Sequence, residues 1–308
     1  YGKPIIAWEV GVKTDISPLE WSLKNNLGVV PSKVINFDSG IFVRNASNSS
    51  LELWDFNSEA YILIETIALQ DTADNIALSP DGSKIAVSFK NEDGIIEIWD
   101  VKSNKMIYSF KMNGWVGAIA FSPNGEELAS TSYRKEMRFW NVATGQLKKS
   151  IPLEDDSRFS YGDFIYSPDG TKLAAQNNNW DFDIWDVTTG KVLYTLQAGE
   201  WTENLVFSPD GQFLASSERL PKEQIYNTIK LWDVNTGNLV MTLENNSIIT
   251  TMSFSPDGKQ LAVASHSDYP SPATIVLWDL TSGTIKQILN GHTMQINNLA
   301  YLSEGTIL

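Results

Sequence analysis

Short segments in which apolar and polar residues alternate recur along the whole chain. In one unit, "VGAIAF" at 116–121 is followed by the turn "SPNG" and the alternating segment "ELASTS" at 127–132. The segments "EMRFWN" at 136–141 and "QLKKSI" at 146–151 follow, separated by a turn that contains "ATG". Period-two alternation bounded by Gly, Pro, Asn and Asp predicts β-strands joined by hairpins. The unit therefore predicts four short strands, and no 3.6-residue helical pattern competes with them.

The unit repeats at a regular spacing. The sequence "FSPDG" stands at 207–211 and 254–258, and close relatives stand at 78–82, 121–125, 166–170 and 301–305. Tryptophans followed by Asp or Asn recur every 41 to 47 residues, at Trp54, Trp99, Trp140, Trp185, Trp232 and Trp278. The Pro-Asp-Gly triplets suit tight turns, because Pro presets one dihedral angle and Gly supplies a positive φ. A four-stranded repeat of this length is typical of a β-propeller blade.

Residues 207–243, "FSPDGQFLASS…IKLWDVNTGNLVMTL", resemble a blade of the WD-repeat family, and similar units cover essentially the whole chain. The "SPDG" and "D-x-x-TG" phrasing resembles WD repeats of bacterial proteins. The family's Gly-His dipeptide occurs only as Gly291-His292, so its buried Asp, His, Ser/Thr and Trp tetrad is incomplete in most units; Asp93 holds the loop position of the tetrad Asp. Apolar packing should therefore carry most of the stability. The residues predicted to be buried on the innermost strands are Ile76, Ile119, Phe164, Leu205, Met252 and Leu299.

Both ends of the chain fit the repeat. Trp8, in "PIIAWEV", lies 46 residues before Trp54 and so reads as part of a third strand, while the C-terminal "INNLAYLSEGTIL" reads as a first strand and part of a second. We predict an all-β fold, a seven-bladed β-propeller of four-stranded antiparallel blades, whose last blade is closed by N- and C-terminal strands. Residues 1–308 would form a single domain, with the seventh blade shared between 1–30 and 291–308. Such closure would remove an exposed sheet edge.

Composition narrows the function classes. The chain has 37 acidic and 23 basic residues and a net charge of −14, so nucleic acid is not expected as a partner. No apolar run approaches the roughly 20 residues that span a bilayer, so membrane insertion is not expected. There is no cysteine, which excludes disulfides and Cys-ligated zinc. The chain starts at Tyr1, so a removed signal peptide stays conceivable; the compartment is open, with the cytoplasm favoured.

Motifs of catalysis and metal binding are scarce. No G-x-S-x-G, P-loop, G-x-G-x-x-G or H-E-x-x-H sequence occurs. The two histidines, His266 and His292, cannot build a three-His zinc site. Asp181, Asp183 and Asp186 could suggest an oxygen-ligand cation site, but alternation places Asp181 and Asp183 on one face, which we expect to be solvated. We therefore predict no catalytic residue, no metal site and no cofactor.

Polar residues directly precede most of the buried innermost positions. Alternation points them away from the core, towards the channel that a propeller would enclose. The plain interpretation is a wet channel, and a small-ligand site is the alternative. These residues are Asn75, Asp163, Asn204, Thr251 and Asn298.

The strongest signal for binding lies on predicted loops. In the WD-repeat family, the loops before the first strand and between strands two and three emerge on one face, which commonly binds partners. Large aromatic residues on solvated loops are costly unless they pack or bind. The alternative is that one or more of these rings cap the core between blades. Long insertions at 218–227 and 266–273 interrupt loops of the same kind. The candidate partner-binding residues are Trp115, Tyr133, Arg134, Lys135, Arg158, Phe159, Tyr161, Trp180 and Trp201.

The leading hypothesis is a non-catalytic protein or peptide interaction scaffold, or a sensor module, that binds on this loop face. Arg134, Lys135 and Arg158 would select an acidic group of the partner. The resemblance implies a signalling module, a monomeric propeller within a larger protein. The alternative is a small-molecule-sensing or hydrolytic propeller that uses Asp163 and Glu203 at the channel mouth. A third possibility is an assembly role, in which the aromatic surface is an oligomer contact.

Overall fold

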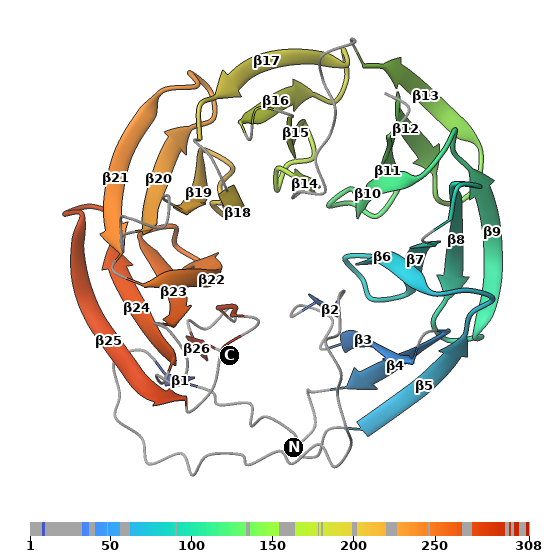
Figure 1. The fold of residues 1–308 in the computed structure, drawn as a ribbon, viewed down its shortest axis with the longest axis horizontal. Helices are drawn as coiled ribbons and strands as arrows, with labels where there is room; N and C mark the ends of the chain where they lie inside the picture. Colours follow the sequence, from blue (N-terminus) through green and yellow to red (C-terminus); the bar gives the residue numbers. More distant parts are fainter. Residues whose placement is uncertain are drawn as a thin grey trace. The chain divides into compact units, whose positions relative to one another are not determined.

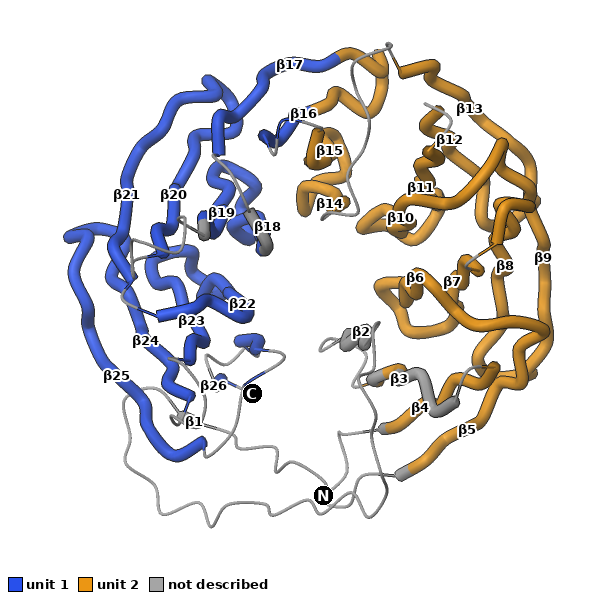
Figure 2. Tube along the Cα trace, in the orientation of Figure 1, with its two compact units in different colours: residues 1–27, 179–184, 192–308 blue, residues 28–178, 185–191 orange. Residues whose placement is uncertain are grey.

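The computed structural model describes most of the chain. The described residues are 8–9, 33–36, 41–47, 49–55, 62–89, 91–133, 136–153, 164–177, 179, 181–198, 202–219, 227–245, 247–266, 273–292, 296, 299–301 and 306–307. Every regular element assigned within them is a β-strand, which confirms the all-β prediction. Figure 2 shows two compact units, residues 1–27, 179–184 and 192–308 in the first and residues 28–178 and 185–191 in the second.

Three antiparallel four-stranded sheets lie in the second unit, and their strands pair in chain order (Figure 1). The first sheet consists of β2 (Lys33–Asn36), β3 (Ile41–Ser47), β4 (Ser50–Asp55) and β5 (Ile62–Ala68). The second consists of β6 (Ala73–Leu78), β7 (Lys84–Phe89), β8 (Ile95–Asp100) and β9 (Lys105–Lys111). The third consists of β10 (Val116–Phe121), β11 (Glu127–Ser132), β12 (Glu136–Asn141) and β13 (Leu147–Pro152).

The remaining four-stranded sheets follow the same order. The division between the units runs through the fourth sheet, β14 (Phe164–Tyr166), β15 (Lys172–Gln176), β16 (Phe182–Asp186) and β17 (Lys191–Leu196). The first unit contains the fifth, β18 (Thr202–Phe207), β19 (Phe213–Arg219), β20 (Asn227–Asp233) and β21 (Leu239–Asn245). It also contains the sixth, β22 (Ile248–Phe254), β23 (Gln260–His266), β24 (Ala273–Asp279) and β25 (Thr284–His292). Such repeated four-stranded sheets are consistent with a β-propeller.

The repeated "SPDG" sequence forms the turn between the first two strands of a sheet. In the second sheet the Ser79 hydroxyl donates to the Asp81 carboxylate over 2.6 Å and accepts from the backbone N–H of Lys84 over 2.9 Å. Gly82 then takes a φ of 68°, a left-handed conformation that favours glycine. The same bonds recur at Ser167 and Ser255, so the repeat is a self-contained hydrogen-bonded turn.

The core lies between neighbouring sheets of a unit. All six apolar residues predicted to be buried on the innermost strands are buried, which confirms that prediction. In the second unit, Ile96 and Ile98 of the second sheet cluster with Leu128 and Trp140 of the third. The first unit repeats this packing between its fifth and sixth sheets. The repeated tryptophans therefore help to hold one sheet against the next.

A β-bulge beside the repeated tryptophan shapes the outermost strand. In the second sheet Trp99 pairs with Met106 and Ile98 with Tyr108, so Ile107 is an extra residue. The bulge bends an edge strand that could otherwise pair with another chain. The residue opposite the tryptophan is between 44% and 48% exposed in five sheets, at Leu63, Met106, Leu147, Leu239 and Ile285.

The two ends of the chain meet within the first unit. β1 (Trp8–Glu9) pairs antiparallel with β26 (Thr306–Ile307), with Trp8 opposite Ile307. Ile307 is fully buried and belongs to a cluster that contains Leu289 of the sixth sheet. Most of residues 1–30 lies outside the described residues, so the four-stranded seventh blade stays a prediction.

The expectation that Asp183 lies on a solvated face is wrong. Asp183 is only 7% exposed, and its carboxylate accepts a 2.7 Å hydrogen bond from the Thr195 hydroxyl. The reason is that β16 is an inner strand of its sheet, and residues Phe182 to Trp185 are all buried. Alternation along a strand separates two faces, but it does not make one of them solvent-exposed.

Candidate partner-binding surface

Two of the nine candidate partner-binding residues, Trp115 and Tyr133, lie among the described residues. The other seven lie outside them and stay predictions: Arg134, Lys135, Arg158, Phe159, Tyr161, Trp180 and Trp201.

The structure brings Trp115 and Tyr133 together. Trp115 directly precedes β10 and Tyr133 directly follows β11, and the Tyr133 N–H donates to the Trp115 carbonyl over 3.0 Å. Their ring centroids lie 6.5 Å apart at an interplanar angle of 88°, the edge-to-face arrangement that aromatic quadrupoles favour. Tyr133 is half-buried and Trp115 is 39% exposed. The pair therefore presents an aromatic surface that is supported on one side.

Trp115 differs in position from the other exposed large apolar residues in the described part of the chain. Those residues lie on the outermost strands of the six sheets. Trp115 instead lies at the start of an innermost strand. Its exposure does not follow from the repeated strand geometry, which makes it the best supported of the candidate binding residues.

The connection between β9 and β10 carries Trp115 and packs closely on the second sheet. A Cβ atom placed on Gly94 would lie 2.3 Å from the Gly114 carbonyl oxygen. Gly94 and Gly114 have φ angles of 65° and 80°. Only glycine at position 94 permits both this backbone conformation and this approach. The connection is therefore held against the neighbouring loop, and Asp93 of that loop forms an exposed 3.1 Å ion pair with Lys111.

Two charged side chains of β12 contact the last residue of β9 and this connection. Arg138 Nη1 donates to the carbonyl of Lys111 over 2.7 Å, and Glu136 Oε2 accepts from Asn113 Nδ2 over 3.4 Å. Arg138 Nε and Glu136 Oε1 form a 2.9 Å ion pair. Burial alone would raise the pKa of Glu136, but bonds from Arg138 and Ser150, with the Arg138 charge, outweigh it and hold that pKa below its usual range.

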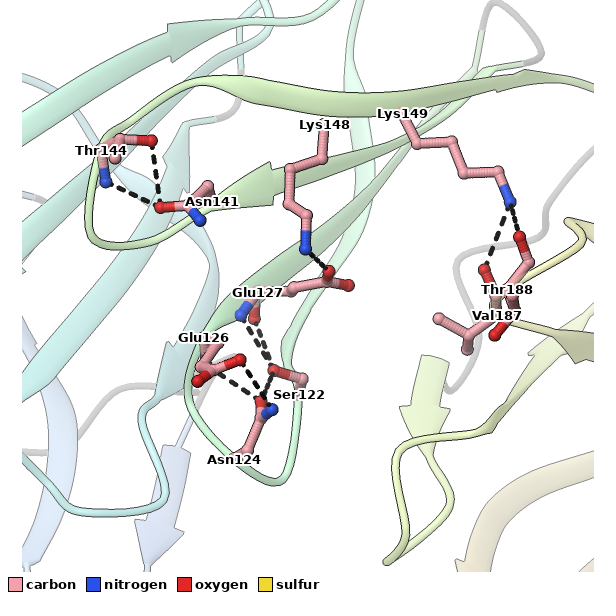
Figure 3. Close-up of polar contacts among 10 residues, drawn as sticks. All are labelled: Ser122, Asn124, Glu126, Glu127, Asn141, Thr144, Lys148, Lys149, Val187 and Thr188. Carbon is pink, nitrogen blue, oxygen red and sulfur yellow. Dashed lines mark hydrogen bonds and ion pairs between the residues drawn. The ribbon is translucent and has the colours of Figure 1, made fainter.

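A cleft of about 400 Å³ lies between the turn that joins β10 to β11 in the third sheet and the turn that joins β14 to β15 in the fourth. Glu127 and Asp169 line it, but Glu127 is ion-paired with Lys148, and Asp169 accepts bonds from Ser167 and Thr171. Figure 3 shows the Glu127–Lys148 pair beside Ser122 and Asn124 of the turn. Both carboxylates are thus bonded within the chain, which gives them a structural role.

The structure describes only some of the residues of the channel alternative, and its two acidic residues stay predictions. Asp163 and the side chain of Glu203 lie outside the described residues. Asn75 and Asn204 are half-buried, and each amide donates to a serine hydroxyl of the neighbouring strand, Ser88 over 3.0 Å and Ser217 over 3.1 Å. These two amides therefore brace the sheet. Within the described part of the chain, no group of three or more His, Asp or Glu residues is placed to hold a metal ion.

The described residues contain no helix of the length and apolar character needed to cross a membrane.

Two segments match the family model of the WD domain, G-beta repeat, at residues 104–141 and 237–279. Residues 162–244 match the model of the eukaryotic translation initiation factor eIF2A. These segments correspond to strands of the second to sixth sheets.

Similar proteins carry WD-repeat names or are named as parts of complexes. The chain is 46% identical over 57 residues to the small ribosomal subunit protein RACK1 of Candida albicans, and the matched segment covers 18% of this chain and 17% of that protein. It is 27% identical over 107 residues to the human WD repeat and SOCS box-containing protein 1, and this match covers 34% of this chain and 25% of that protein. It is 24% identical over 123 residues to the Elongator complex protein 2 of Drosophila melanogaster, and this match covers 34% of this chain and 16% of that protein. The chain matches a quarter or less of the length of each of these relatives, and its resemblance to WD-repeat proteins is confirmed over the matched segments.

Proposed function

We propose that this protein is a non-catalytic interaction module that binds a protein or peptide on the surface formed by Trp115 and Tyr133. The main observation behind this proposal is that Trp115, at the start of an innermost strand, is 39% exposed while its ring packs against the ring of Tyr133. Tryptophan and tyrosine are enriched among the residues that dominate binding energy, because a rigid ring offers a large contact area. A supported, exposed indole suits an anchor that enters a partner's pocket.

The similar proteins support the general role. One is named as a protein of the small ribosomal subunit and another as a protein of the Elongator complex, so both are parts of larger assemblies. Neither name identifies a partner for this chain.

The finer features of the proposal rest on the sequence. The module is a seven-bladed propeller with bacterial-type repeats, monomeric, and part of a larger, cytoplasmic signalling protein. Its partner carries an acidic group that Arg134, Lys135 and Arg158 select, since arginine pairs in a two-pronged manner with carboxylate or phosphate. Trp180 and Trp201 stay further candidate anchors in this proposal.

Selection of peptides tests the proposal. A random peptide library displayed on phage is panned on the immobilised protein, and enriched peptides are titrated against two variants. Trp115→Ala removes the anchor, whereas Met106→Ala is the matched control, because Met106 is 45% exposed on the outermost strand β9. We expect Trp115→Ala to weaken binding by about tenfold or more, a loss of roughly 1.4 kcal/mol, and Met106→Ala to leave it unchanged. Peptides that bind Trp115→Ala as tightly as the wild type would refute the surface, and failure to enrich any peptide over the bare support would refute the interaction role.

A further inference from the structure

The end of β9, from which the connection to Trp115 leads, is bonded to the third sheet by one cation. Arg138 lies two residues before Trp140 on β12, and its guanidinium lies 5.7 Å from the centroid of that ring. From there Nη1 donates to the Lys111 carbonyl over 2.7 Å. The side chain is only 16% exposed, although its bond to the Lys111 carbonyl lies at an exposed position. A hydrogen bond from a charged donor is stronger than one between neutral groups.

Glu136 holds that cation and contacts the same connection. Its Oε1 lies 2.9 Å from Arg138 Nε and accepts from the Ser150 hydroxyl over 2.5 Å. Its Oε2 accepts from Asn113 Nδ2. The two carboxylate oxygens of Glu136 therefore link β13 and β12 to the connection. Asn113, the residue contacted in the connection, lies two residues before Trp115.

The fifth sheet repeats the arrangement with lysine. Lys230, two residues before Trp232, donates to the carbonyls of Gln197 and Ala198 over 3.3 and 2.8 Å, and it pairs with Glu218 over 3.1 Å. These carbonyls belong to the connection that leads into β18. The ammonium lies 6.0 Å from the centroid of the Trp232 ring, so the cation occupies the same place on its sheet.

The other four sheets have no cation at this position. The equivalent residues, two before the repeated tryptophan, are Glu52, Glu97, Asp183 and Val276. A carboxylate or an alkyl group cannot donate to a carbonyl. The sequence also places a tryptophan directly before the innermost strand in the third and fifth sheets alone, Trp115 before Val116 and Trp201 before Thr202. Trp201 itself lies outside the described residues. The cation and the tryptophan thus occur together.

We infer that Arg138, oriented by Glu136, is a positioning residue: it fixes the end of β9, from which the connection to β10 leads, and so presents Trp115 to the partner. The inference rests on the proposed function for its role in binding, but its structural content stands alone. A connection without these bonds would sample more conformations, and ordering it on binding would cost affinity.

Fluorine NMR tests the positioning without a partner. The protein is labelled with 5-fluorotryptophan, and the signal that Trp115→Phe removes is assigned to Trp115. We expect Arg138→Gln to shift and sharpen this signal while most other tryptophan signals stay in place. Arg138→Lys should restore it, since Lys230 makes the equivalent bonds in the fifth sheet. Lys111→Ala is the control, because it deletes the exposed side chain at the same residue and keeps the carbonyl that Arg138 bonds.

A second variant protects the test against misfolding. Glu136→Ala removes the Asn113 bond and the partner of Arg138, and it should move the Trp115 signal in the same direction. The inference is overturned if the signal keeps its wild-type position in Arg138→Gln or, where that variant does not fold, in Glu136→Ala.

The two proposals fail in different ways. With a selected peptide, Arg138→Gln should weaken binding by less than Trp115→Ala does. If the fluorine signal moves but Trp115→Ala binds the peptide normally, the positioning stands and the proposed surface falls. If Trp115→Ala loses the peptide while the signal never moves, the surface stands and the positioning role falls.

Discussion

The phenolic hydroxyl of Tyr108 donates a 2.6 Å hydrogen bond to the backbone carbonyl of Ala143. Tyr108 lies on the outermost strand of the second sheet, next to its bulge, and Ala143 lies in the turn between β12 and β13 of the third. A Cβ atom on Gly145 of that turn would lie 2.5 Å from the Tyr108 ring. The ring therefore packs flat on a glycine while its hydroxyl fastens the turn.

The same link recurs at the equivalent position of other sheets. Tyr194 donates to the carbonyl of Asn235 in the first unit. In the second unit Lys149 donates to the carbonyls of Val187 and Thr188, as Figure 3 shows. A sheet is thus fastened to the next at its outer margin as well as through its core.

Tyr108→Phe should lower the free energy of unfolding by about 1 kcal/mol, because it deletes one hydrogen bond and keeps the ring on Gly145. Gly145→Ala should cost more, since it adds a clash with the ring to the strain of a φ of 71°. Urea denaturation of both variants measures this. A Tyr108→Phe protein as stable as the wild type would show that the link contributes nothing.

Sheets differ in how they satisfy the indole N–H of the repeated tryptophan. In the third sheet Trp140 Nε1 donates to the Ser130 hydroxyl over 2.9 Å. In the second sheet Trp99 Nε1 donates instead to Glu97 over 2.9 Å. In the sixth sheet the buried Nε1 of Trp278 has no hydrogen-bond partner among the described residues.

Val263→Ser should give the Trp278 N–H an acceptor, because Val263 occupies the register position that Ser130 has in the third sheet. The matched control is Val87→Ser, at the same register position beside Trp99, whose N–H is already bonded. Both valines are fully buried, so both changes lose apolar burial. Val263→Ser should therefore cost about 1 kcal/mol less than Val87→Ser in thermal or urea unfolding. Equal losses of stability in the two variants would contradict the conclusion that the Trp278 N–H lacks a hydrogen-bond acceptor.

Glu97 should make stability fall as pH rises. It is 4% exposed, and burial raises the pKa of its carboxyl, a shift that the bond from Trp99 only partly opposes. A raised pKa means that the folded state favours the protonated acid. The stability this provides is complete below the ordinary value of 4.5 and is lost as pH rises through the folded pKa.

Glu97→Gln should consequently be more stable than the wild type at neutral pH, with the difference shrinking as pH falls towards 4.5. Unfolding measured across this range checks it. Glu52→Gln is the control, since Glu52 makes the same bond to Trp54 over 3.0 Å from a half-buried site, and its effect should be smaller. A gap that stays constant with pH would rule out the titration of Glu97.

Asp81 should act in the opposite direction, in acid. The bond from the Ser79 hydroxyl, aided by bonds from Ser83, lowers the pKa of Asp81 from 3.8 to about 2. Its contribution is present above the ordinary value and is lost as pH falls from 3.8 towards 2. The stability of Asp81→Asn should fall less steeply with acid than that of the wild type, because the amide of asparagine does not titrate. The turn should be kept, since the amide oxygen still accepts, as Asn124 does from Ser122 over 2.7 Å. Equal slopes between pH 4 and pH 2 would disprove this.

The pairing of the chain ends has a direct test. Deletion of residues 1–9 should lower the melting temperature, because it removes the strand that pairs with β26 and uncovers Ile307. Ile307→Ala should destabilise as well, by about 2 kcal/mol or more, since the side chain is fully buried. Melting unchanged by the deletion would mean that the terminal strand does not close the fold.

Local chemistry along the chain sufficed to predict the strands, the turns and the buried innermost positions. The "SPDG" turn is closed by its own side chains, as Ser79 and Asp81 show, so its sequence carries its structure. The burial of Ile119 and Met252 likewise follows from alternation beside such a turn. Of the nine candidate binding residues, the structure shows that Trp115 and Tyr133 contact each other, and binding by any of the nine stays a prediction.

The packing of sheets against one another decided the rest. Asp183 and Glu97 are buried because an inner strand is covered on both faces, which alternation alone cannot reveal. The role of Arg138 was not predicted, because Lys111 is 27 residues away in sequence and only strand register and sheet packing bring its carbonyl to the guanidinium. The sequence by itself thus determined the repeating strands and turns, whose bonds are local. Only the tertiary structure decided which polar groups meet between sheets, because those contacts depend on neighbours that are distant along the chain.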